Sequence, residues 1–278
     1  MTTHGPDCGT RDGQESDALL DRLLVGHEAH IWYTDPALVA EASLVAAYRE
    51  LLSPAERERN ARFLFERGRH ADLVTRVLVR TTLSRYWPGI APTDWQFVVG
   101  PHGKPEVVRP RGCPELRFNL SHTDGSIVCL VAAGHDVGVD VEDTTRTGTV
   151  DVETIAERYF SARELAAIRG APPSSRRSTF FDCWTLKEAY VKARGLGLQL
   201  PLDRFAVQVG PHDDAAIRRA TIAFDAEIAD DPRAWQFLVC SPTPRHRLAI
   251  AIYRPGEPDL TVRVWSTVPL SPDPDGGG

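Results

Sequence analysis

The sequence has 278 residues, enough for one large domain or two small ones. Hydrophobic residues make up 42% and charged residues 25%, as in ordinary globular proteins, and the net charge of −6 gives no reason to expect nucleic acid as a partner. Five scattered cysteines without a Cys-x-x-Cys pair argue against zinc sites and disulfide frameworks. With no apolar run of membrane-spanning length and no signal-peptide core, we expect a cytoplasmic protein without a membrane partner.

The first half of the chain begins with a loose, polar tail over residues 1–25 that ends in a short helical turn. A strand over 30–34 and a helix over 38–51 should follow. Ser53 and Glu56 then have the spacing of a capping box. This half continues with an Arg-rich helix after Ser53, a long helix over 67–86, a strand over 95–99, a constrained loop over 100–105 that presents a lysine, and strands over 116–122 and 126–133.

The second half repeats this order of elements. A strand over 137–142 precedes a second capping box at Ser161 and Glu164. A Pro/Ser/Arg-rich loop over 172–177 then leads into a long helix that ends at Gly195, a residue suited to a left-handed cap. Strands should follow near 205–209, 221–227, 235–240, 248–253 and 260–268.

The repeated order predicts an α+β fold of two similar α/β subdomains related by a pseudo-twofold. Each subdomain should be an antiparallel sheet packed against a long helix. We place the N-terminal subdomain at 26–135 and the C-terminal subdomain at 136–268, between flexible tails at 1–25 and 269–278. The boundary between the halves is then a natural place for a ligand cleft.

Three carboxylates in the second half suggest a metal site. Residues 137–142 alternate strictly, so Asp140 and Glu142 should lie side by side on one face of a strand. Neighbouring carboxylates repel unless a proton or cation lies between them. Glu188 lies on or beside an apolar helical stripe, with Lys192 one turn further on the same side. If Glu188 joins the pair, the three form a Mg²⁺ or Mn²⁺ site that water and a substrate phosphate complete.

Each of these features has a simpler interpretation when it is taken alone. Asp140 and Glu142 fit the solvated face of an edge strand, and Glu188 with Lys192 fits a surface ion pair worth ~0.3–0.5 kcal/mol. Lys104 fits an ordinary turn lysine equally well. The order and combination of the motifs therefore decide between the two interpretations.

In combination, the motifs resemble those of one enzyme family. Residues 138–142 (GVDVE), followed by 184–192 (WTLKEAYVK) and 195–198 (GLGL), resemble the signature pair of 4′-phosphopantetheinyl transferases. Ser53-Pro54 with its following arginines, residues 103–105 (GKP) and residues 118–122 (FNLSH) agree with this family. The resemblance covers roughly residues 30–255, and the chain length is similar to that of the monomeric, surfactin-synthetase-activating (Sfp) type.

The resemblance implies a reaction, its cofactor and its partners. Such enzymes transfer the 4′-phosphopantetheine arm of coenzyme A to a serine of an apo acyl or peptidyl carrier protein, and they release adenosine 3′,5′-bisphosphate. The carriers serve fatty-acid, polyketide or nonribosomal peptide biosynthesis. Asp140, Glu142 and Glu188 would hold the metal on the diphosphate. The catalytic residues would be Glu188 and Lys192, with Lys192 facing the leaving phosphate, while the resemblance leaves the base as either Glu188 or a water on the metal.

The resemblance also assigns the residues that bind coenzyme A. Lys187 would help to bind the diphosphate, and Asp140 and Lys192 would contact it as well. Glu56 is a departure, because some relatives have a second basic residue at this position for the 3′-phosphate. Two alternative functions for the chain are another metal-dependent phosphoryl or nucleotidyl transferase and a non-catalytic module that binds carrier proteins. The first half of the chain would supply Arg59, Lys104, Pro105, Asn119, Ser121 and His122.

Overall fold

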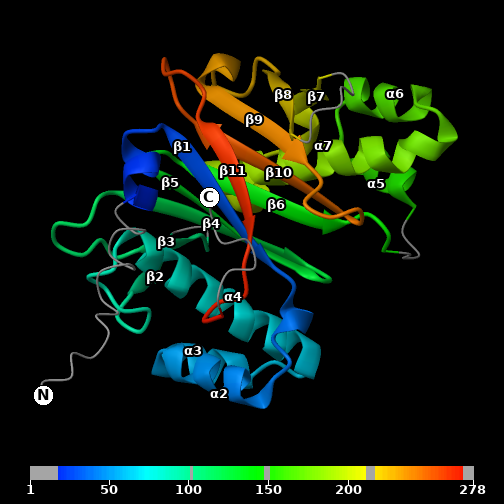
Figure 1. Ribbon diagram of the computed structural model, residues 1–278. Coiled ribbons are helices and arrows are strands. Elements are labelled where there is room, and N and C mark those ends of the chain that lie inside the picture. The colour runs from blue at the N-terminus through cyan, green and yellow to red at the C-terminus, as the bar shows by residue number, and fades with distance from the viewer. Residues whose placement is uncertain (1–17, 101–102, 147–150, 211–216, 272–278) are drawn as a thin grey trace, which may run out of the picture.

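A computed structural model describes residues 18–100, 103–146, 151–210 and 217–271 (Figure 1). Most of the predicted N-terminal tail and nearly all of the C-terminal one lie outside these ranges. Residues 18–24 are helical, as predicted for the end of the first tail. The helices of the first half are η1 (Pro36–Leu38), α2 (Ala42–Leu51), α3 (Pro54–Ala61) and α4 (Glu66–Tyr86), and its strands are β1 (Glu28–Thr34), β2 (Phe97–Val99), β3 (Pro105–Val107), β4 (Leu116–Thr123) and β5 (Ser126–Ala133).

The second half contains the remaining elements. Its helices are α5 (Val152–Tyr159), α6 (Ala162–Gly170), α7 (Pro173–Arg194), η2 (Gly197–Gln199), η3 (Leu202–Arg204) and η4 (Pro232–Ala234). Its strands are β6 (Val137–Asp143), β7 (Phe205–Val209), β8 (Ile217–Phe224), β9 (Trp235–Cys240), β10 (His246–Tyr253) and β11 (Thr261–Ser266). Among the helices of the described residues, none is long and apolar enough to cross a membrane.

Two main sheets carry the fold. One has the strand order β11-β1-β5-β4 and the other the order β6-β10-β9-β8-β7, and β2 and β3 form a separate hairpin. The predicted α+β architecture of two sheets, each with its own long helix, is confirmed: α4 contacts β4 and β5, and α7 contacts β6 and β10 (Figure 1). Apolar side chains of β1 and β5 meet those of β6, β9 and β10 in a shared central core.

The last strand does not follow the predicted division at residue 136. β11 pairs with β1 in parallel, so the chain end returns to the first sheet instead of completing the second. This pairing covers an edge of β1 that would otherwise expose unpaired backbone groups. The sequence order of strands could not indicate it, because the partner lies more than 200 residues away in the chain.

Local signals set the ends of the helices near the site. Both predicted capping boxes are formed, by Ser53 with Glu56 and by Ser161 with Glu164. Gly195 ends α7 in the left-handed conformation with φ of 63°. The segment predicted as a Pro/Ser/Arg-rich loop is instead the first turn of α7, because Pro173 at an early helical position has a backbone angle suited to a helix start.

Helix α7 packs unusually closely on β6, and Gly138 permits this contact. A Cβ atom at residue 138 would lie 2.0 Å from the carbonyl oxygen of Ala189 and 2.5 Å from the amide nitrogen of Ala193. Real Cβ atoms do not approach backbone atoms this closely, so only glycine fits. The contact holds the motif-bearing helix directly against the strand that carries Asp140.

The two halves meet where β4 lies beside β6. No backbone ladder joins these two strands among the described residues; side chains of alternate β4 residues accept hydrogen bonds from alternate β6 amides instead. The constant offset of 20 positions means that the two strands run parallel here. We call this contact the seam: Val139 N donates to Asn119 Oδ1 (2.8 Å), Val141 N to Ser121 Oγ (3.2 Å) and Asp143 N to Thr123 Oγ1 (3.3 Å).

Candidate active site

A cavity of about 560 Å³ opens beside the seam. Its walls come from both halves of the chain, since β3 and β4 supply one side and α5, α7, η2 and η3 supply the other. Apolar groups cover most of it, and a few charged groups converge on it, as in typical small-molecule sites. The lining residues that bear on the chemistry are Lys104, Pro105, Asn119, Glu188 and Lys192.

Asp140 is the central carboxylate next to this cavity. It is buried on β6, and its Oδ1 accepts hydrogen bonds from Lys192 Nζ (2.6 Å) and Ser121 Oγ (3.0 Å). Its Oδ2 is buried without a hydrogen-bond partner. Buried carboxylate oxygens rarely lack a partner, so this atom is a candidate ligand position.

The other two carboxylates are electrostatically coupled to Asp140. Burial and the nearby Asp140 raise the pKa of Glu142 to about 7, although Trp184 Nε1 donates a hydrogen bond to Glu142 Oε1 at 3.3 Å. Burial and Asp140 also raise the pKa of Glu188. Asp140 therefore disfavours the charged forms of both Glu142 and Glu188, an effect that a bound cation would reverse.

These residues fit a hard divalent cation by their chemistry. Carboxylate oxygens are the ligands that Mg²⁺ and Mn²⁺ prefer, and the unpartnered Asp140 Oδ2 is available to one. Within the described residues, no three His, Cys, Asp or Glu side chains are placed so that together they could hold a metal ion, so Asp140, Glu142 and Glu188 would have to rearrange to share one. The Lys192 side chain is 29% exposed, and its amine forms the ion pair with Asp140.

Comparison with known proteins identifies the family. A model described as "4'-phosphopantetheinyl transferase, N-terminal" matches residues 40–135, and one described as "4'-phosphopantetheinyl transferase superfamily" matches residues 136–252. The chain is 31% identical to 4'-phosphopantetheinyl transferase HetI of a Nostoc species over 197 residues, which are 71% of this chain and 81% of that protein.

The chain belongs to the 4′-phosphopantetheinyl transferase superfamily. It is also 28% identical to 4'-phosphopantetheinyl transferase Sfp of Bacillus subtilis strain 168 over 216 residues, covering 77% of this chain and 88% of that one. A 4'-phosphopantetheinyl transferase of Bacillus subtilis is 34% identical over 158 residues, which are 57% of this chain and 66% of that protein. The predicted resemblance to the Sfp type of phosphopantetheinyl transferase is thus confirmed.

In this member of the superfamily, Lys187 lies behind the cavity wall and is not among the residues that line the cavity. Its amine is fully buried, pairs with Glu164 Oε2 at 2.8 Å and donates to the carbonyl oxygens of Leu202 (2.7 Å) and Phe205 (2.5 Å). The three N–H bonds of the amine match these three acceptors. The predicted contact with the diphosphate is therefore corrected, since Lys187 joins α7 to α6 and β7 instead.

Glu56, the departure from the family pattern, has a structural role. It completes the capping box of α3 and pairs with the buried guanidinium of Arg80 at 2.7 Å. Arg59 lies exposed on the same helix, outside the set of residues that line the cavity. His122 is exposed at the end of β4, and partial burial of its ring and the nearby Lys192 lower its pKa.

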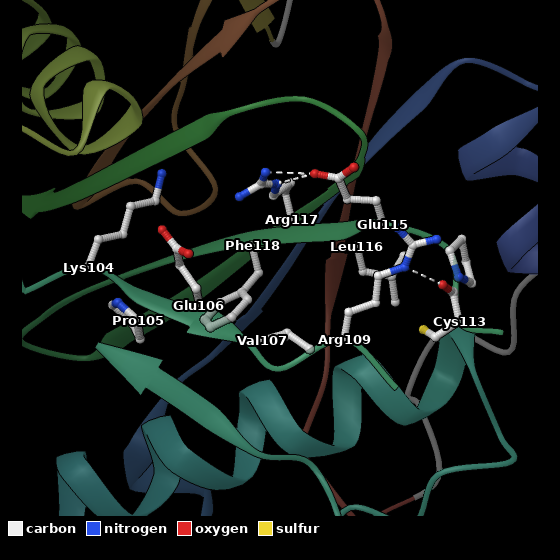
Figure 2. A pocket seen from close by; sticks show the side chains of 11 residues that line it. Lys104, Pro105, Glu106, Val107, Arg109, Cys113, Glu115, Leu116, Arg117 and Phe118 are labelled. Atoms are coloured by element: carbon white, nitrogen blue, oxygen red, sulfur yellow. Dashed lines mark hydrogen bonds and ion pairs between the residues drawn. The ribbon is translucent and has the colours of Figure 1, made fainter. Parts of the chain in front are cut away.

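A second, smaller cavity of about 310 Å³ adjoins the first (Figure 2). Lys104 and Pro105 line both cavities, so β3 forms part of the wall between them. At its far end, Arg109 Nε donates to the carbonyl oxygen of Cys113 at 2.7 Å.

Sequence reasoning missed Arg158 and Tyr159, which line the larger cavity from the end of α5. Helix α5 itself was not predicted. A signal was present, because Asp151 caps the helix through Glu153 N and apolar residues follow at helical spacing. The preceding residues 147–150 lie outside the described part of the chain.

Proposed function

We propose that this protein transfers the 4′-phosphopantetheine arm of coenzyme A to a serine hydroxyl of an apo acyl or peptidyl carrier protein. The supporting observation, in a member of this superfamily, is that Glu188 and Lys192 line one cavity, while Asp140 binds Lys192 and acts electrostatically on Glu142 and Glu188. Two charged groups of α7 thus line a space that borders both halves, and Asp140 of β6 is bonded to one of them. A diphosphate needs this kind of charge neutralisation when it is cleaved.

In the proposed reaction, the serine oxygen bonds to the phosphorus that carries the pantetheine arm. The bond from that phosphorus to the bridging oxygen breaks, and adenosine 3′,5′-bisphosphate leaves with the bond's electron pair. Lys192 has its amine at the cavity wall, where it can neutralise charge that develops on the leaving phosphate. A Mg²⁺ or Mn²⁺ held by Asp140, Glu142 and Glu188 would supply further charge neutralisation on the diphosphate.

The serine proton needs an acceptor, and we propose Glu188. This side chain lines the cavity, and burial together with Asp140 raises its pKa above that of an ordinary glutamate. A carboxylate at the cavity wall can accept the proton of a hydroxyl group that reaches it there. Pro105, Arg59 and His122 would contact the adenosine end of coenzyme A from the first half, as the resemblance implies. Asn119 and Ser121 would act from the seam, where both already have backbone partners.

We propose a monomeric enzyme that meets its carrier protein at the cavity mouth, as the resemblance to the Sfp type implies. We propose that it acts in the cytoplasm, on carriers of fatty-acid, polyketide or nonribosomal peptide assembly. Coenzyme A should raise the melting temperature of the protein, whereas ATP should not. That comparison separates the proposed function from other phosphoryl or nucleotidyl transferases.

The direct test is the mass of several apo carrier proteins after incubation with coenzyme A, Mg²⁺ and the protein. Wild type should add one phosphopantetheine to at least one carrier, and Glu188→Gln should abolish the addition without unfolding the protein. Glu106→Gln, an exposed carboxylate next to the adjoining cavity, is the matched control and should retain activity. No mass gain on any carrier would refute the proposed function.

A further inference from the structure

We propose that Lys104 is a positioning residue that clasps the two halves together, and not a ligand of the 3′-phosphate of coenzyme A. This inference rests on the proposed transferase function. The Lys104 amine donates to the carbonyl oxygen of Val137 at 3.0 Å and to that of Ala193 at 3.4 Å. Val137 begins β6 and Ala193 lies in the last turn of α7, so one side chain of the first half binds two elements of the second half.

The orientation of the side chain agrees with this role. In Figure 2 the Lys104 amine points away from Arg109 and Cys113, at the other end of the small cavity. Its stem therefore contributes to the walls of both cavities, while its charged end reaches across to the second half.

The two carbonyl groups flank the point at which α7 touches β6. Gly138 follows Val137, and it is the residue at which a side chain would collide with Ala189 and Ala193. The last carbonyls of a helix have no partner within the helix and carry its negative dipole end, so a lysine amine is well suited to them. Burial lowers the pKa of Lys104, while Asp136 and Glu106 act in the opposite direction and favour the charged form.

The clasp bears directly on the proposed active site. Lys192 immediately precedes Ala193, and Glu188 lies little more than one turn earlier on the same helix. Pro105, which lines the opposite wall of the cavity, immediately follows Lys104. Lys104 therefore fixes the spacing between that wall and the end of α7, which carries both proposed catalytic residues.

Two phosphopantetheine donors, coenzyme A and 3′-dephospho-coenzyme A, distinguish a clasp from a ligand of the 3′-phosphate. We expect Lys104→Met, which removes the hydrogen bonds to Val137 and Ala193, to lower kcat/KM by about tenfold with both donors. A ligand of the 3′-phosphate would instead matter only with coenzyme A, because 3′-dephospho-coenzyme A lacks that group. Arg109→Met is the control, since it removes a cation from the same small cavity without touching the seam, and it should leave both values near wild type.

Amide hydrogen exchange gives a readout that does not depend on activity. In Lys104→Met, the amides of Ala193 and Gly195 should exchange about tenfold faster than in wild type, because the end of α7 loses its anchor. Thus, if no carrier is ever modified, the proposed function fails while the clasp is still tested. A loss confined to coenzyme A, unchanged kcat/KM with both donors, or unchanged exchange at these amides would each overturn the proposal.

Discussion

Replacing Glu142 by glutamine should stabilise the metal-free protein at high pH. Burial and Asp140 raise the pKa of Glu142 from 4.5 to about 7 in the folded state. An acid with a raised folded pKa contributes its full stabilisation below its unfolded pKa, and this contribution is lost as the pH rises through about 7. At about 1.4 kcal/mol for each pH unit between the two pKa values, the upper bound is about 3 kcal/mol. Because the side chain is only half-buried, solvent screening reduces the expected effect to about 1 kcal/mol.

The assay is urea unfolding of wild type and Glu142→Gln with a chelator present, at pH 5 and pH 8. From pH 5 to pH 8, the free energy of unfolding of Glu142→Gln should rise by about 1 kcal/mol relative to that of wild type. The corresponding relative rise in melting temperature is about 2–4 °C. Glutamine can still accept the hydrogen bond from Trp184, so packing should change little. A stability difference that is equal at both pH values would refute the reasoning, and Glu106→Gln, at an exposed position, is the control.

Two further substitutions test the packing beneath the site. Gly138→Ala should lower the free energy of unfolding by about 3 kcal/mol, because its Cβ would lie 2.0 Å from the Ala189 carbonyl oxygen. Stability near that of wild type in urea unfolding would contradict the close contact between α7 and β6. Lys187→Met should lower the free energy of unfolding, measured by thermal unfolding, by about 3–5 kcal/mol, because it leaves the buried Glu164 carboxylate without its cation. If Lys187→Met instead kept its stability and lost only activity, the structural role assigned to this lysine would be wrong.

The elements that carry the signature motifs could be predicted from the sequence. The alternation over residues 137–142 fixed both the strand and the face of Asp140, and the apolar spacing with Gly195 fixed the long helix and its end. These signals are local, because they depend on the period of an element and on the chemistry of its cap.

The partners of individual side chains could not be predicted in the same way. Motif reasoning assigned Lys104, Ser121 and Lys187 to coenzyme A but could not indicate their protein partners, which are backbone carbonyls for Lys104, a β6 amide for Ser121 and Glu164 for Lys187. Periodicity tells which face of an element a residue occupies, but it does not tell which other element lies opposite. The return of β11 to β1 was hidden for the same reason.

The most direct test of the account is calorimetric titration of coenzyme A into the protein with and without Mg²⁺. The account predicts that Mg²⁺ strengthens coenzyme A binding to wild type, and that Asp140→Asn removes most of this gain because the unpartnered Oδ2 is replaced. Binding of equal strength with and without Mg²⁺, or a full Mg²⁺ effect in Asp140→Asn, would contradict the proposal that these carboxylates hold a cation on the diphosphate.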